Sequence, residues 1–193
     1  MLLFSIIADE VPFKVQEQNK VLDNLIFEIS KENMQALELL YEKTKTAVYG
    51  FALSILRNPQ NAEDVMQETY INVYNGASGY QSRGKPMAWI LTIVRNLSLM
   101  KLRQGNRQET SLDEAQELKD SSNFEQTSIE HMILQTALTV LSEEERQIII
   151  LHSLSGLKHR EIALILDIPL STTLSKYHRG LAKLKKYIEK EER

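Results

Sequence analysis

The 193-residue chain has no cysteine, which excludes disulfide bonds and thiolate metal ligands. It also has no long hydrophobic run, because the apolar start at residues 1–7 meets Asp9 and Glu10 almost at once. That run is too short for a membrane span or for the apolar core and flanks of a signal peptide. The sequence therefore predicts a cytoplasmic protein without membrane insertion.

Strand signals are also scarce, and only 7 glycines and 4 prolines punctuate the chain. No run of β-branched residues alternates with polar ones, whereas helical periodicity is widespread. We predict an all-α fold with two small helical domains joined by a flexible acidic linker, the second domain being a helix-turn-helix. The expected boundaries are an extension over 1–23, a helical domain over 24–104, a linker over 105–127 and a second domain over 128–193.

Charge is distributed unevenly, although the net charge is only −3. Residues 24–104 carry 9 basic and 7 acidic side chains, and residues 131–193 carry 10 and 8. Residues 105–130 between them carry 2 basic and 7 acidic side chains, and they show no apolar periodicity. Such a polar stretch is typical of a tether, so we expect the two domains to move independently.

The first domain is expected to contain a broken helix followed by two further helices. Asn58-Pro59 marks the end of the first pair, because the residue before proline is disfavoured in a helix. On the last helix, which starts at Pro86, the spacing predicts a buried stripe of Trp89, Ile93, Leu97 and Met100. The expected helices cover residues 25–57, with a break near residues 30–33, then 62–74 and 86–104.

The second domain ends in two helices separated by a short turn. A capping box, Ser142 with Glu145, opens an earlier helix that stops at Gly156. A short helix near residues 158–166 follows, and the last helix begins after Pro169, with Ser171 or Thr172 as its expected cap. That last helix has an apolar stripe and a cationic stripe. The apolar residues are Leu174, Tyr177, Leu181, Leu184 and Ile188, and the cations are Lys176, Arg179, Lys183 and Lys186.

Two helices joined by a tight turn, the second being basic, describe a DNA-binding helix-turn-helix. Phosphates would supply affinity, and the first turns of the helix would reach base edges. The alternative from the residues alone is a solvated basic face on an ordinary packing helix.

Two segments together resemble the extracytoplasmic-function (ECF) class of bacterial sigma factors. LRNPQNAEDVMQETYINVY followed by MAWILTIVRNLSLMKLRQ is similar to the domain that binds polymerase and melts the promoter. LSEEERQIIILHSLSGLKHREIALILDIPLSTTLSKYHRGLAKLKK is similar to the domain that reads the −35 element. The resemblance implies a factor that binds core RNA polymerase and directs promoter recognition and transcription initiation. An anti-sigma factor is a candidate further partner.

The resemblance also implies site residues. Asp64, Gln67 and Glu68 share one helix face, which would dock on the clamp helices of the polymerase β′ subunit; from the residues alone a face of this kind is more often simply solvated. Residues implied for the −10 element are Arg83, Lys85, Arg95, Asn96 and Arg103. Residues implied for the −35 element are Ser171, Thr172, Ser175, Lys176, Arg179, Lys183 and Lys186.

Most departures from the family pattern concern the last two helices, and Met100 is a further one on the helix implied for the −10 element. Asp167 stands in the turn where glycine is common, and Leu174 occupies a frequently basic position. Gly180 interrupts the last helix, at a helix-propensity cost of about 1 kcal/mol.

Two other functions compete with this interpretation. A conventional helix-turn-helix regulator with an N-terminal sensing or dimerisation domain would explain the last helix but not the basic residues at 83–103. An enzyme is more distant, because the histidines show no metal-binding spacing and no phosphate-binding loop is present. We therefore expect no catalytic residue, metal or cofactor. The four histidines are His131, His152, His159 and His178.

Overall fold

The computed structural model describes residues 12–108 and 139–191, and in these two ranges it contains helices and no strand. The all-α prediction is confirmed. The predictions for most of the linker, for residues 1–11 and for the start of the second domain lie outside the described residues. The helices are α2 (Pro12–Ile29), α3 (Met34–Leu56), α4 (Pro59–Gly76), the 3-10 turn η1 (Ala77–Gly79), α5 (Pro86–Gln108), α7 (Glu143–Ser155), α8 (His159–Leu166) and α9 (Leu170–Glu191).

Local chemistry sets the helix boundaries in the first domain. The side chain of Asn33 accepts hydrogen bonds from the backbone of Gln35 and Ala36 and so caps α3. Asn58 caps α4 in the same way through the Asn61 N–H, and Pro59 occupies the first turn. The predicted break near residues 30–33 is confirmed, whereas α2 begins at Pro12, well before the expected start near residue 24.

The core of the first domain uses a different side of α5 from the one predicted. Ile90, Leu91 and Val94 are fully buried, whereas Trp89 is half-buried and Met100 is exposed. Apolar residues follow two neighbouring stripes on this helix, and the spacing is helical for both. The predicted stripe therefore lies at the margin of the core: Trp89, Ile93 and Leu97 are partly buried against it, and only the predicted burial of Met100 is wrong.

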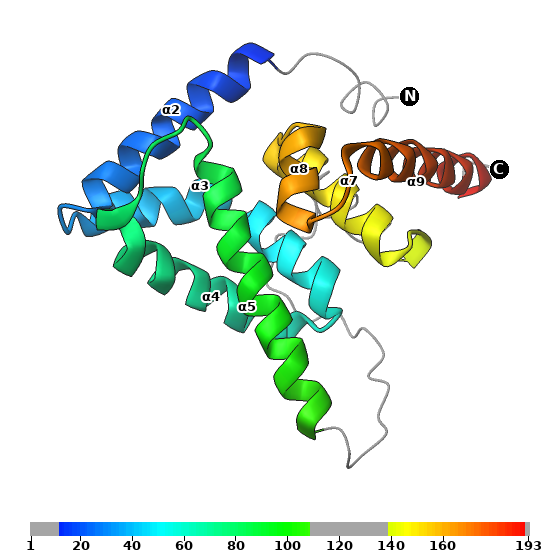
Figure 1. Cartoon of the computed structure of the whole chain (residues 1–193), viewed down its shortest axis with the longest axis horizontal. Helices are drawn as coiled ribbons and strands as arrows, with labels where there is room; N and C mark the ends of the chain where they lie inside the picture. The colour runs from blue at the N-terminus through cyan, green and yellow to red at the C-terminus, as the bar shows by residue number, and fades with distance from the viewer. Residues whose placement is uncertain (1–11, 109–138, 192–193) are drawn as a thin grey trace.

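The two domains pack against one another, with α7 lying along α3 and α8 beside α5 (Figure 1). Arg146 of α7 is only 1% exposed, and its Nε donates to the carbonyl oxygen of Ser54 in α3 at 3.0 Å. Burial lowers the pKa of this guanidinium to about 10, and the nearby Arg57 acts in the same direction. The sequence predicts that the two domains move independently. In the structure, an apolar interface that contains the buried Arg146 side chain joins them instead.

The helix-turn-helix is present, with its turn at Asp167. That residue adopts the left-handed conformation (φ 57°, ψ 47°), which aspartate tolerates better than most residues. The N–H of Ile168 then donates to the carbonyl oxygen of Ala163, which closes the end of α8. The predicted tight turn is confirmed.

The buried side of α9 is shifted from the predicted stripe. Thr173, Tyr177, Gly180 and Leu184 are buried at spacings of 4, 3 and 4, whereas Leu174 is exposed. A Cβ at position 180 would lie 2.7 Å from Ile149 Cδ1 of α7. Gly180 therefore lets this side of α9 approach α7 closely. Thr173 lies on the same side and is buried, so the predicted burial of Leu174 is wrong.

Candidate polymerase and nucleic-acid interfaces

The candidate polymerase face of α4 is exposed in the structure. Asp64, Gln67 and Glu68 all face solvent, while Val65 and Thr69 of the same helix are buried. Lys101 of α5 lies with its Nζ 2.5 Å from Asp64 Oδ2. A docking partner on this face would therefore meet the carboxylate of Asp64, which already has an ion pair with Lys101. One turn further on it would meet the exposed side chains of Gln67 and Glu68.

The candidate −10 residues fall into two groups. Arg83, Asn96 and Arg103 are exposed. Arg95 instead donates from Nη2 to the carbonyl oxygen of Leu166 at 3.3 Å, and Lys85 Nζ lies 3.2 Å from Glu161 Oε1. Both of these partners are on α8, so two of the five candidate −10 residues are engaged in contacts with the second domain.

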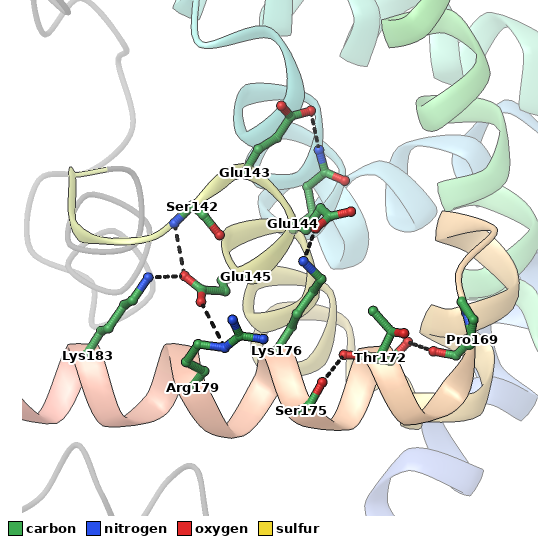
Figure 2. A network of polar contacts seen from close by, with 12 residues as sticks. Ser142, Glu143, Glu144, Glu145, Pro169, Thr172, Ser175, Lys176, Arg179 and Lys183 are labelled. Atoms are coloured by element: carbon green, nitrogen blue, oxygen red, sulfur yellow. Dashed lines mark hydrogen bonds and ion pairs between the residues drawn. The ribbon is translucent and has the colours of Figure 1, made fainter.

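Three of the four candidate −35 cations meet carboxylates of α7 (Figure 2). Lys176 pairs with Glu144 of that helix. Arg179 and Lys183 both meet Glu145, with nitrogen–oxygen distances of 3.7 Å and 2.6 Å. These three cations of the stripe therefore pair within their own domain, whereas Lys186 is exposed.

Glu145 is the centre of this ion-pair network and is only 3% exposed. Burial alone would raise the pKa of its carboxyl, but hydrogen bonds from Lys183 and Ser142 hold the pKa below its usual value. Its Oε2 also accepts the backbone N–H of Ser142 at 3.1 Å, as the capping box predicts. The sequence showed the cap but not the ion pairs, because no local spacing links residue 145 to residues 179 and 183.

The outward side of α9 carries mostly uncharged residues in its first turns. Ser171, Ser175 and His178 are exposed there, and Lys186 is exposed further along. The helix already begins at Leu170, and Thr173 donates to the carbonyl oxygen of Pro169 through Oγ1. Ser171 and Thr172 therefore lie inside the first turn rather than at the predicted cap position.

Three of the four histidines surround Tyr177. His152 and His159 stack with ring centroids 4.7 Å apart, and His159 meets the Tyr177 ring edge-on at 4.5 Å. The His178 ring meets the Tyr177 ring edge-on at 5.6 Å, and His131 is outside the described residues. Within the described ranges, no group of three His, Cys, Asp or Glu side chains could hold a metal ion.

The fold and these surfaces define a two-domain helical protein with a helix-turn-helix at its C-terminal end. Comparisons with known proteins agree, because the sigma-70 region 2 family matches residues 40–108 and the sigma-70 region 4 family matches residues 131–184. The chain belongs to the sigma-70 family of RNA polymerase sigma factors, in its ECF class.

Curated relatives include two mycobacterial ECF RNA polymerase sigma factors named SigK. The one from Mycobacterium sp. (strain KMS) is 28% identical over 146 residues, which are 74% of this chain and 71% of the relative. The one from Mycobacterium bovis (strain BCG / Pasteur 1173P2) is 28% identical over 175 residues, which are 87% of this chain and 94% of the relative.

Two solved structures share the fold. Sigma factor RpoE, in complex with the anti-sigma factor NepR from Bartonella quintana, has a TM-score of 0.64 at 22% identity, covering 82% of this chain and 98% of the solved one. CnrH, in complex with the cytosolic domain of CnrY, has a TM-score of 0.57 at 18% identity, covering 88% and 97%. In the described ranges, no helix is both long and apolar enough to cross a membrane.

Proposed function

We propose that this sigma factor binds core RNA polymerase through α4, holds the −10 element on α5 and reads the −35 element with α9. The observation that carries the proposal is the order and placement of two matched regions. Residues 40–108 and 131–184 match the two sigma regions, and the second region ends in an exposed helix behind a tight turn at Asp167.

The polymerase-binding part rests on the exposed face of α4. Asp64, Gln67 and Glu68 project from a helix whose opposite side is buried, so a partner can reach all three without any change in the core. The two carboxylates, Asp64 and Glu68, suit a basic helical surface, as the clamp helices of the β′ subunit would provide.

The DNA-binding part rests on both basic surfaces. Arg83, Asn96 and Arg103 on and before α5 offer exposed groups to single-stranded −10 DNA, and Arg95 and Lys85 join them once they leave α8. Arg179, Lys183 and Lys186 flank the outward side of α9, where phosphates of the −35 duplex would lie.

Regulation by an anti-sigma factor belongs to the same proposal, because the RpoE relative was solved with one. The chain would act in the cytoplasm, where its polymerase and promoter are. Its role is that of a transcription initiation factor rather than an enzyme.

The test is co-purification of the full chain with core RNA polymerase, followed by transcription from a library of promoters. We expect a stable complex and initiation at a subset of promoters that core polymerase alone does not use. The matched variant reverses charge at Asp64 and Glu68 together, which should weaken core binding while circular dichroism stays helical. Sequence-specific DNA binding by the chain without polymerase, and no initiation with it, would indicate a conventional regulator instead.

A further inference from the structure

The first two turns of α9 expose an apolar side chain, Leu174. Leu174 is 37% exposed, and Ser171, Ser175 and His178 lie on the same outward side of the helix. A single exposed leucine means little by itself, because folded proteins expose many apolar atoms. Leu174, however, lies on the second helix of the helix-turn-helix, the helix that enters the major groove of DNA in this motif.

The cation nearest to Leu174 in the sequence, Lys176, has its partner on another helix. Lys176 pairs with Glu144 of α7 and is among the less exposed cations of the helix. Arg179 is the first basic residue of α9 with a largely exposed side chain, at 59%, and it lies more than a turn beyond Leu174. Base contacts from the start of α9 therefore depend on uncharged side chains.

The chemistry of the base edges then limits what Leu174 can recognise. In the major groove, guanine, adenine and cytosine present hydrogen-bond donors and acceptors, whereas thymine also presents the C5-methyl group. A leucine side chain can neither donate nor accept a hydrogen bond. The methyl group of thymine is the one feature that an apolar side chain matches.

We propose that Leu174 is a specificity-determining residue that contacts the C5-methyl group of a thymine in the −35 element. The inference rests on the proposed function of α9 as the −35 reader. It predicts a preference for thymine at one position, in place of the guanine that a basic residue would favour there. Leu170, exposed one turn earlier on the same side, would extend the apolar contact toward the neighbouring sugar or base.

The test uses holoenzyme assembled from the full chain and core RNA polymerase. A preferred −35 sequence is first selected from a randomised library. Each thymine of that element is then replaced singly by deoxyuridine, which removes only the C5-methyl group. At one position we expect promoter binding to weaken about fourfold, the effect of one buried methyl group.

Variants at position 174 connect this effect to the side chain. In L174A the difference between thymine and deoxyuridine should disappear, and in L174M it should persist. L174K should shift the selected base toward guanine. L164A is the matched control: Leu164 is a 78% exposed leucine of α8, and its loss should leave the methyl effect unchanged.

Each outcome separates this inference from the proposed function. Selection of a −35 sequence with no methyl-sensitive thymine, or a methyl effect that survives in L174A, overturns the role of Leu174 and leaves the sigma function intact. Weaker binding of L174A to core polymerase, with the methyl effect unchanged, would show that the leucine contacts protein instead. If the holoenzyme selects no −35 sequence at all, the proposed function itself fails.

Discussion

The two candidate DNA-binding helices differ in where their cations find partners. On and just before α5, Arg95 and Lys85 bind Leu166 and Glu161, which belong to the other domain. On α9, Lys176 and Lys183 bind Glu144 and Glu145, which belong to the same domain. The first set of contacts must break when the domains separate, whereas the second set is unaffected by separation.

This difference teaches that the two DNA surfaces depend on domain arrangement to different degrees. In the packed form, α9 keeps an exposed outward side, while two of the five candidate residues for the −10 element are occupied by α8. Domain separation should therefore expose the −10 surface and leave the −35 surface as it is. The contacts concerned are few and partly exposed, so modest changes should shift the balance.

The largest effect should come from removing the buried cation between α3 and α7. R146A leaves the carbonyl oxygens of Ser54 and Leu141 without their guanidinium partner and empties a fully buried volume. We expect a loss of about 3 kcal/mol in the free energy of unfolding. Urea denaturation followed by circular dichroism measures it. R160A, an exposed change on α8, should alter stability by less than about 0.5 kcal/mol. Equal effects of the two variants would contradict the anchoring role of Arg146.

The next effect concerns the contact of α9 with α7. G180L forces a side chain against Ile149, so it should lower the free energy of unfolding by about 1 to 3 kcal/mol despite the better helix propensity of leucine. G105L is the matched control, because Gly105 is also helical and a Cβ placed there would meet nothing within 4 Å. That control should gain up to about 1 kcal/mol. A stabilised G180L would show that α9 does not need the close approach.

Salt dependence should distinguish two lysines of α9. Lys186 is exposed, so K186A should reduce the slope of log affinity against log salt by about 1. Lys183 shares its charge with the buried Glu145, so K183A should change the slope less. Promoter binding by the holoenzyme is titrated at several salt concentrations. A larger change for K183A would mean that its ion pair with Glu145 breaks on DNA.

A smaller effect should follow from loosening the contact between α5 and α8. E161Q removes the charge that holds Lys85, so the free factor should bind single-stranded −10 DNA about twofold to threefold more tightly. Fluorescence anisotropy with a labelled oligonucleotide measures this. E143Q, on the exposed side of α7, is the control and should not change the affinity. Unchanged binding by E161Q would show that α8 does not restrict the −10 surface.

The smallest effect is a pH dependence of the free energy of unfolding, which comes from His159 packed against Tyr177 of α9. Burial lowers the pKa of His159, and the neighbouring His152 and His178 lower it further. As the pH falls through the unfolded value near 6.5, the unfolded chain takes up a proton before the folded one, so stability decreases. H159F keeps the ring stacking and should flatten this dependence in urea melts between about pH 7.5 and 5.5. H178Q removes the smallest of the three causes of the lowered pKa, so it should weaken this dependence only in part.

The sequence by itself determined the features that depend on near neighbours in the chain. The caps at Asn33 and Asn58, the turn at Asp167 and the polar face of α4 all follow from residues within one or two helical turns. On α4, the spacing of Asp64 and Glu68 puts them on one face whatever packs against the other. The two sigma-like segments likewise lie in continuous stretches of sequence.

Only the tertiary structure decided which of two neighbouring helix stripes is buried. On α5, apolar residues follow adjacent stripes with the same helical spacing, so the position of the packing partner selects between them. On α9 the predicted and observed stripes share Tyr177 and Leu184, and the close approach at Gly180 decides the rest. That selection buried Thr173 and exposed Leu174. It also joined Glu145 to Lys183 and Arg95 to Leu166, because residues 38 and 71 positions apart meet only when the helices pack.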